Sequence, residues 1–534
     1  MTFFALLGMF SSFLTPGIVA PALADFSRPI DVVSVSWPNS PIPSTTVGAV
    51  RSAVESYATP YWHSHANIDF IPGMDSFTPI RMSAEAPCDG SATVTYMDSV
   101  AEKFYSSQGL NVGNRYLIIL LPALSGNCVW EAKSLVGDYR TPYGITVLQN
   151  NAIPYVITHE LGHALGLGHT DYMSCATPGD SPWSACQNIE YGGAVDIMSN
   201  IESTGPLNVY HQWRLGLLTG DSIASVSESR QYLLNTSGSS SGLRALYIHD
   251  GSAVYWVEYR PATDSYAPGL AVFRSDTPVS PIATVSVNTE YTGKYTGDSS
   301  GDVWLLNLSD YKYGDIPTGS PTGWSFSTYS GNVSISASPS GDQALVDITV
   351  KPGTVLMPLP AAPTDLSKYT FATGDFGSTY QVTPVQDGNQ LTDPTLQICN
   401  GTYASESHRI SRTQVAANPI YPSKYLFISS EAVQYESAYW ANEALKELDL
   451  VSSSCSKKVA TIKKLNYLAP GNVASRALLA ISTINKVPQN LIATFQVKGN
   501  ILVGTYVLST LSYTPKDIAR WLKLSQKTGA HLNS

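Results

Sequence analysis

Apolar residues follow two different periods along the first part of the chain, and each period predicts a different element. Over residues 46–63 they recur at helical spacing, whereas residues 115–121 form a continuous apolar run of strand length. The same reasoning predicts further strands at 32–37, 67–72 and 144–149, a helix at 98–106, and a long helix from about residue 153. Because strands and helices are mixed here and strands dominate later, the expected fold class is α+β.

From residue 222 the pattern changes to alternating apolar and polar positions separated by turn signals. Residues 245–248 and 253–259 flank His249-Asp250-Gly251-Ser252, which predicts a hairpin. Residues 333–335 and 345–350 repeat this pattern around Ser340-Gly341-Asp342. We expect a β-rich, sandwich-like domain, and the alternative is that these strands extend a sheet of the first domain.

A proline-rich stretch separates this β-rich part from a third segment. Pro352, Pro358, Pro360 and Pro363 predict a stiff, extended linker. Beyond it the pattern predicts a helix at 435–448, a hairpin formed by 491–497 and 501–508, and a closing helix at 515–527. The expected division is a leader at 1–24, a catalytic domain at 25–220, a β-rich domain at 221–351, a linker at 352–377, and a small α/β binding domain at 378–534.

The first 24 residues end in Pro21-Ala22-Leu23-Ala24 after an apolar stretch, as a secretory signal peptide does. A buried N-terminal helix is the alternative. No later stretch reaches the roughly 18 apolar residues of a membrane span, so no transmembrane anchor is expected. The even set of cysteines suits a secreted protein with three disulfides, and the domain division favours neighbouring pairs: Cys88 with Cys128, Cys175 with Cys186, and Cys399 with Cys455.

Charge is scarce and unevenly distributed along the chain. Charged residues make up 13% of the sequence, and 31 Lys and Arg against 41 Asp and Glu give a net charge of −10. From residue 456 onward, however, the cationic residues strongly outnumber the acids, of which Asp517 is the only one. We therefore expect an acidic body with a basic tail. Without a recognisable binding motif, nucleic acid is not an expected partner.

Candidate chemistry is concentrated in the segment His159-Glu160-Leu161-Gly162-His163-Ala164-Leu165-Gly166-Leu167-Gly168-His169. His159 and His163 are four residues apart, so on a helix both imidazoles can reach one ion. Gly166 can adopt a positive φ and end the helix, which would bring His169 back as a third ligand. Three imidazoles suit Zn²⁺ and leave a fourth position open for water, and Glu160 is then the candidate general base.

This segment resembles the metzincin clan of zinc endopeptidases, whose extended motif His-Glu-x-x-His-x-x-Gly-x-x-His is complete here. The resemblance implies a methionine in a tight turn beneath the zinc, and Met198 in Asp196-Ile197-Met198-Ser199 is the candidate. Within the clan the chain is most similar to the gametolysin family, through Tyr191-Gly192-Gly193, Asn208, His211 and Leu215-Gly216. Gly193 and Ser199 depart from that family's pattern.

The C-terminal segment loosely resembles extracytoplasmic sensor domains of actinobacterial receptor kinases and lipoproteins, around Cys399-Asn400-Gly401-Thr402 and the later Cys455. This resemblance implies a binding module without catalytic residues. In its last predicted helix, one face collects four cations, here called the cationic stripe: Lys516, Arg520, Lys523 and Lys527. The stripe is a candidate site for an anionic cell-wall or lipid polymer, and the alternative is an ordinary solvated helix face.

Two functions follow from these patterns. The leading hypothesis is a secreted zinc-dependent endopeptidase, a hydrolase that acts on protein or peptide substrates. The alternative is a catalytically idle, secreted binding or adhesion protein on the same scaffold. The intact Glu160 favours the enzyme, because an idle scaffold has no need of a general base.

Overall fold

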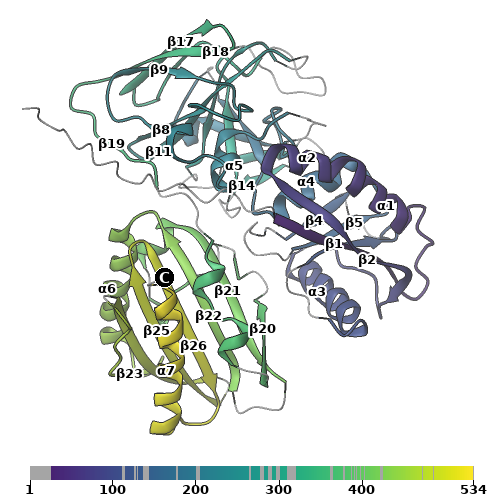
Figure 1. The fold of residues 1–534 in the computed structure, drawn as a ribbon, viewed down its shortest axis with the longest axis vertical. Coiled ribbons are helices and arrows are strands. Elements are labelled where there is room, and N and C mark those ends of the chain that lie inside the picture. The colour runs from purple at the N-terminus through teal and green to yellow at the C-terminus, as the bar shows by residue number, and fades with distance from the viewer. Residues whose placement is uncertain are drawn as a thin grey trace, which may run out of the picture.

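The computed structural model describes residues 26–532, apart from the following internal positions: 89, 111–114, 126–127, 129, 136, 138–143, 176–178, 200–204, 264–265, 277–281, 287–291, 296–300, 310–319, 361–364, 377–378, 386–387, 390, 392–393, 397, 402, 421–424, 472 and 485. The expected signal peptide lies outside the described residues. Among the residues described, no helix is both long and apolar enough to cross a membrane. Helices and sheets are mixed, as the α+β class requires (Figure 1).

The N-terminal part is built on a five-stranded sheet in the order β2-β1-β3-β5-β4. Its strands are β1 (Phe26–Ser36), β2 (Ile68–Arg81), β3 (Tyr116–Leu121), β4 (Ala132–Ser134) and β5 (Gly144–Gln149). Neighbouring strands are parallel except β4, which runs antiparallel to β5 at the sheet edge. All six residues of β3 are buried, because helices cover both faces of the sheet.

Those helices are divided between the two faces, as Figure 1 shows. One face carries α1 (Val47–Ala53), α2 (Thr59–Ala66) and α4 (Pro154–Ala164), and the other carries α3 (Gly90–Ser107). The predicted helix at 46–63 therefore exists, although residues Val54–Ala58 within it are π-helical. The helix predicted at 98–106 begins earlier than expected, and the strand predicted at 67–72 continues to Arg81.

A second, ten-stranded sheet has the order β14-β13-β7-β6-β15-β12-β11-β10-β19, with β8 paired to β10. The strands are β6 (Thr170–Cys175), β7 (Cys186–Glu190), β8 (Ile223–Ser225), β10 (Ala245–Asp250), β11 (Ala253–Arg260), β12 (Gly269–Arg274), β13 (Ile282–Ser286), β14 (Thr292–Tyr295), β15 (Val303–Leu306) and β19 (Leu356–Met357). Because β6 and β7 precede residue 220, this sheet combines strands from both sides of the boundary expected between the catalytic and β-rich domains. This agrees with the alternative expectation, in which the β-rich segment extends a sheet of the first domain. The domain boundaries themselves stay a prediction.

The two faces of this sheet are covered differently because its side chains alternate. Tyr255 of β11 packs in the core shared with a four-stranded sheet, which makes this region sandwich-like. That sheet has the order β16-β17-β18-β9 and comprises β9 (Arg230–Leu234), β16 (Ser325–Ser327), β17 (Val333–Ser340) and β18 (Gln343–Val350). The next residue, Trp256, packs on the opposite face against α5 (Val209–Arg214).

The C-terminal part is a seven-stranded antiparallel sheet between two helices. Its strand order is β20 (Tyr380–Pro384), β21 (Arg409–Pro419), β22 (Tyr425–Tyr435), β26 (Ile501–Ser509), β25 (Val487–Lys498), β24 (Ala474–Ile484) and β23 (Thr461–Lys464). Adjacent residues of β25 point to opposite faces: Ala493 packs with α6 (Ala438–Ser454), and Ile492 packs with α7 (Pro515–His531). The predicted hairpin and both predicted helices are present.

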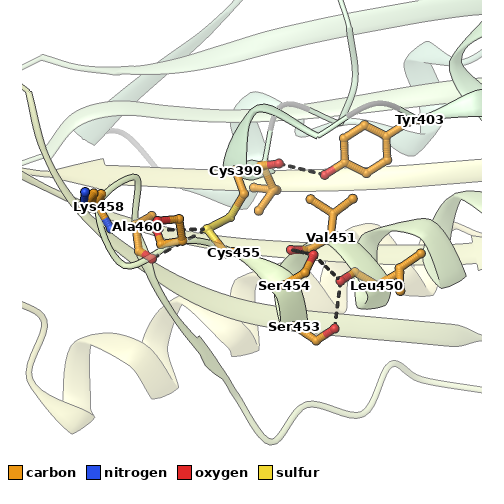
Figure 2. Close-up of a disulfide and its surroundings, with 11 residues drawn as sticks. Cys399, Tyr403, Leu450, Val451, Ser453, Ser454, Cys455, Lys458 and Ala460 are labelled. Atoms are coloured by element: carbon orange, nitrogen blue, oxygen red, sulfur yellow. Dashed lines mark hydrogen bonds between the residues drawn. A yellow bond between two sulfur atoms is a disulfide. The ribbon is translucent and has the colours of Figure 1, made fainter.

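Three disulfides join Cys88 to Cys128, Cys175 to Cys186, and Cys399 to Cys455. These are the neighbouring pairs that the sequence favoured. The second bridge connects β6 to β7, and the third fastens the C-terminal end of α6 to the turn at Ile398–Asn400 (Figure 2). Beside the third bridge, the Tyr403 hydroxyl donates a hydrogen bond to the Ile398 carbonyl at 3.0 Å.

Candidate metal centre

The local sequence explains how α4 begins and ends. Pro154 occupies the first turn, where backbone N–H groups have no partner within the helix, so the missing N–H of proline costs no hydrogen bond. The helix ends at Ala164, and Gly166 follows with φ of +92°, a conformation that side chains other than glycine resist. The chain therefore reverses directly after the helix, and His169 returns beside the two histidines that α4 carries.

The three histidines form a compact cluster. Their ligating nitrogens all lie within 4.8 Å of one another, and it is the only group of three or more His, Cys, Asp or Glu side chains with such spacing in the described chain. His163 Nε2 lies 3.1 Å from His159 Nε2 and 3.1 Å from His169 Nε2. Two nitrogens bound to a tetrahedral zinc at about 2.0–2.1 Å would lie about 3.3 Å apart, so the donor set fits this ion.

Carbonyl groups determine which nitrogen of each helical histidine faces the cluster. Nδ1 of His159 is 2.8 Å from the Ile197 carbonyl, and Nδ1 of His163 is 2.8 Å from the Leu167 carbonyl. Each Nδ1 must donate its proton there, so each Nε2 presents a lone pair to the cluster. The lone pairs of two Nε2 atoms only 3.1 Å apart repel one another unless a cation lies between them. This arrangement is therefore typical of a metal site.

Burial keeps the cluster neutral. Desolvation, opposed by smaller hydrogen-bond effects, lowers the pKa of His159 to about 4 and that of His163 to about 3. It also holds the pKa of His169 well below its usual range. Near pH 7 all three imidazoles are therefore unprotonated, as metal ligands must be.

Glu160 lies on the same helix and is 7% exposed. Its Oε2 atom is buried without a hydrogen-bond partner among the described residues. Burial raises the pKa of Glu160 to about 8, although the Lys133 ammonium on β4 opposes this shift. A cation held by the neighbouring histidines would lower this pKa again, and a carboxylate without protein hydrogen bonds is then suited to accept and return a proton rather than to hold the fold.

Met198 lies in a turn beneath α4 and is fully buried. Its sulfur approaches Gly162 so closely that a Cβ at that position would be 2.3 Å away. The turn is fixed by the Thr170 N–H, which donates to the Met198 carbonyl at 2.9 Å, and by Ile197, whose carbonyl orients His159. The methionine therefore lies where the resemblance implied, and its role stays a prediction.

A buried polar network supports this turn, and sequence reasoning did not find it. Asp196 accepts hydrogen bonds from the Thr170 hydroxyl and from the Asn208 backbone and side chain. Burial raises the pKa of Asp196, but His211, the Asn208 N–H and the Arg260 charge outweigh it and lower the pKa to about 2. His211 Nδ1 is 3.6 Å from Asp196 and takes part in this network rather than in the histidine cluster.

Tyr191, which the sequence offered only as part of a family resemblance and not as a site residue, lies beside the histidine cluster. Its ring centroid is 4.1 Å from that of His169 and 5.7 Å from that of His159. Its φ is +63°, which is rare for a residue with a bulky side chain and is found most often at functional sites. The sequence signal for it was the Tyr191-Gly192-Gly193 segment, which lies between the third histidine and Met198.

The cationic stripe is exposed on α7, while Trp521 on the opposite side of the helix is buried. Lys527 Nζ donates to the Asp375 carbonyl at 2.9 Å, and the Arg520 guanidinium lies 5.2 Å from the centroid of the Trp521 ring, so two of the four cations are partly engaged. No feature of the described residues assigns a ligand to the stripe. Binding of an anionic polymer therefore stays a prediction.

Two histidines and a buried glutamate on α4, with His169 from the following segment, give three candidate ligands and leave a fourth position open, as in catalytic rather than structural zinc sites. The model of one family, described as dual-action HEIGH metallo-peptidases, matches residues 137–190, a span that includes α4 and all three histidines. The match supports a zinc metallopeptidase in general. It does not single out the gametolysin family, which the sequence had favoured.

Two further comparisons add little. No curated protein matches the chain. Among solved structures, one match is to the crystal structure of the extracellular domain of PknH from Mycobacterium tuberculosis. The match covers 32% of this chain and 97% of the PknH chain, at 10% identity and a TM-score of 0.23. A likeness this weak carries no argument about fold or function.

Proposed function

We propose that this chain is a secreted zinc-dependent endopeptidase that hydrolyses peptide bonds in protein or peptide substrates. The observation that carries the proposal is the convergence of three neutral imidazoles next to the buried, unpartnered carboxylate of Glu160. His159, His163 and His169 would hold the metal. When bound, zinc lowers the pKa of a water molecule and polarises the scissile carbonyl.

The other roles in the reaction belong to residues of the chain. Oε2 of Glu160 accepts a proton from the attacking water and delivers it to the leaving amine, so one carboxylate serves in both steps. The Ile197 and Leu167 carbonyls hold two of the imidazoles in the tautomer that binds metal. The low exposure of Glu160 limits the access of bulk water to its proton.

The edge of the first sheet suggests how a substrate is held. β4 is the last strand in the sheet order, and it runs antiparallel to β5 next to α4. An extended peptide could pair with its outer edge and present one peptide bond to the histidine cluster, as peptides do when they add a strand to a sheet. Such binding depends on main-chain hydrogen bonds and predicts broad sequence tolerance.

Secretion is part of the proposal. Three disulfides among six cysteines are typical of proteins that fold in an oxidising compartment. The apolar leader of the sequence agrees with this, although it lies outside the described residues. Cleavage after Ala24 in culture supernatant would support this part of the proposal.

The Glu160→Gln variant separates the enzyme from the idle binding protein. It keeps the size of the side chain, so about one zinc per chain should still bind, while hydrolysis of a quenched generic peptide should fall roughly 10²- to 10⁴-fold. Glu228→Gln is the matched control, because Glu228 is exposed in the β-rich part, far along the chain from α4. An unchanged rate in Glu160→Gln would exclude Glu160 as the general base, whereas a zinc-loaded parent with no hydrolysis above the buffer blank would favour the binding protein.

A further inference from the structure

The third histidine is held by a segment more than a hundred residues later in the chain. The His169 N–H donates to Oδ1 of Asp302 at 2.8 Å, and the His169 carbonyl accepts from the Val303 N–H at 3.0 Å. Both backbone groups of this candidate ligand are therefore bonded to residues 302–303, which we call the clasp. His159 and His163 need no such support, because α4 already fixes their backbone.

The clasp requires an unusually close approach of two backbone segments. A Cβ placed on Gly168 would lie 2.4 Å from both the backbone nitrogen and Oδ1 of Asp302. A Cβ on Gly301 would lie 2.9 Å from the Gly168 nitrogen, and Gly301 has φ of +111°. Glycine at both positions is thus what permits the carboxylate to reach the His169 amide.

Regular structure continues from the clasp and fixes its register. β15 pairs in parallel with β6, which starts directly after His169, and Val303 is opposite Thr170. All four residues of β15 are buried. The Gly301 carbonyl also lies 3.2 Å from Nε2 of the buried His211. The clasp is therefore anchored in the core of the ten-stranded sheet and is not a loose surface contact.

We propose that Asp302 is a positioning residue for the metal centre, and that it acts by fixing the backbone of His169. The proposal rests on the proposed zinc site. Asp302 is 5% exposed, so little water competes for the carboxyl oxygen that accepts from the His169 N–H. Without the Asp302 hydrogen bond, the backbone of His169 would be less ordered before zinc binds. The entropy lost in ordering it would then weaken zinc binding.

The test is the zinc dissociation constant of the full-length chain, measured by competition with a chromogenic chelator. Asp302→Ala should weaken zinc binding about 10- to 100-fold, the usual effect of removing a group that orients a ligand. Asp302→Asn keeps an oxygen acceptor and should recover most of the affinity. The d–d absorption of the Co²⁺-substituted protein should change in Asp302→Ala and remain near that of the parent in Asp302→Asn.

Asp250→Ala is the matched control. Asp250 is also 5% exposed in the β-rich part, and it accepts bonds from Thr328, Ser330 and Asn332. Its loss should destabilise the fold without changing the zinc affinity. A general structural effect would instead lower the affinity of both alanine variants together, and that outcome would overturn the proposal.

Other outcomes are equally decisive. If the parent binds no zinc, the proposed metal centre itself is wrong. If the parent binds zinc and Asp302→Ala binds it equally well, the clasp has no positioning role while the proposed function stands. Should Asp302→Ala not fold, Gly168→Ala replaces it, because its Cβ would push the clasp apart while retaining the carboxylate; an unchanged zinc affinity in that variant would again overturn the proposal.

Discussion

Replacing Arg260 by Met tests how far the β-rich strands support the candidate site. Alternation along β11 places Arg260 and Glu258 on the face that carries α5, and the two side chains form a buried ion pair. Arg260 also donates to the carbonyls of Val195 at 2.8 Å and Pro206 at 3.2 Å, on either side of the Met198 turn. Glu258 accepts from the Val209 N–H at the start of α5.

The expected cost of Arg260→Met follows from burial. Arg260 is 1% exposed and Glu258 is fully buried, so the variant leaves an uncompensated carboxylate in the core. Removing one partner of such a pair typically costs about 3–5 kcal/mol of unfolding free energy. Urea denaturation at constant pH measures this quantity. The double variant Glu258→Gln/Arg260→Met should lose less, because no charge is then left buried.

The stability loss of Arg260→Met should depend on pH, and its direction follows from the pKa of Glu258. Burial raises the pKa of Glu258 in the folded parent even though Arg260 opposes the shift, so without Arg260 the pKa rises further. A carboxyl group with a raised folded pKa adds stability below its unfolded pKa of about 4.3, and this stability is lost as the pH rises through the folded pKa. The penalty for Arg260→Met should therefore be smaller at pH 5 than at pH 8.

Two results would refute this reasoning. A loss below about 1 kcal/mol at pH 8 would mean that the pair is not desolvated as the structure indicates. A penalty that grows toward low pH would mean that Glu258 is not the group left without a partner. In either case the β-rich strands would not stabilise the Met198 turn through this pair.

Further variants test the remaining features. His163→Ala should remove zinc from the chain, as metal analysis will show, and an unchanged zinc content would exclude this ligand set. Replacing Cys399 and Cys455 by Ala opens a loop of 56 residues and should cost about 4 kcal/mol of unfolding free energy, measured in urea. Gly162→Ala should lower the melting temperature, because its Cβ overlaps Met198; a higher melting temperature would show that helix propensity outweighs this overlap. Reversing the first three charges of the cationic stripe to Glu should weaken salt-sensitive retention on cell-wall material and leave peptide cleavage intact, whereas equal retention would favour a plain solvated face.

Local sequence was sufficient for the parts of the candidate site that lie within one helix and its end. Four-residue spacing brings His159 and His163 to one face, Glu160 follows the first of them, and Gly166 permits the reversal, all through interactions between near neighbours in the chain. The C-terminal hairpin and the closing helix, which Thr514 caps in the structure, were predictable for the same reason.

Tertiary structure alone decided what surrounds these residues. Asp302 reaches His169, and Arg260 reaches the carbonyls of Val195 and Pro206 beside the Met198 turn, only because strands distant in sequence pair in one register. Nothing in the local sequence distinguishes these two residues from other charged residues of the chain. The same holds for the ten-stranded sheet, which combines strands from both sides of residue 220. Short-range sequence patterns determine helices, turns and ligand spacing. Pairing between distant strands depends instead on how the whole chain buries its apolar residues. Partners more than a hundred residues apart therefore become evident only in the folded protein.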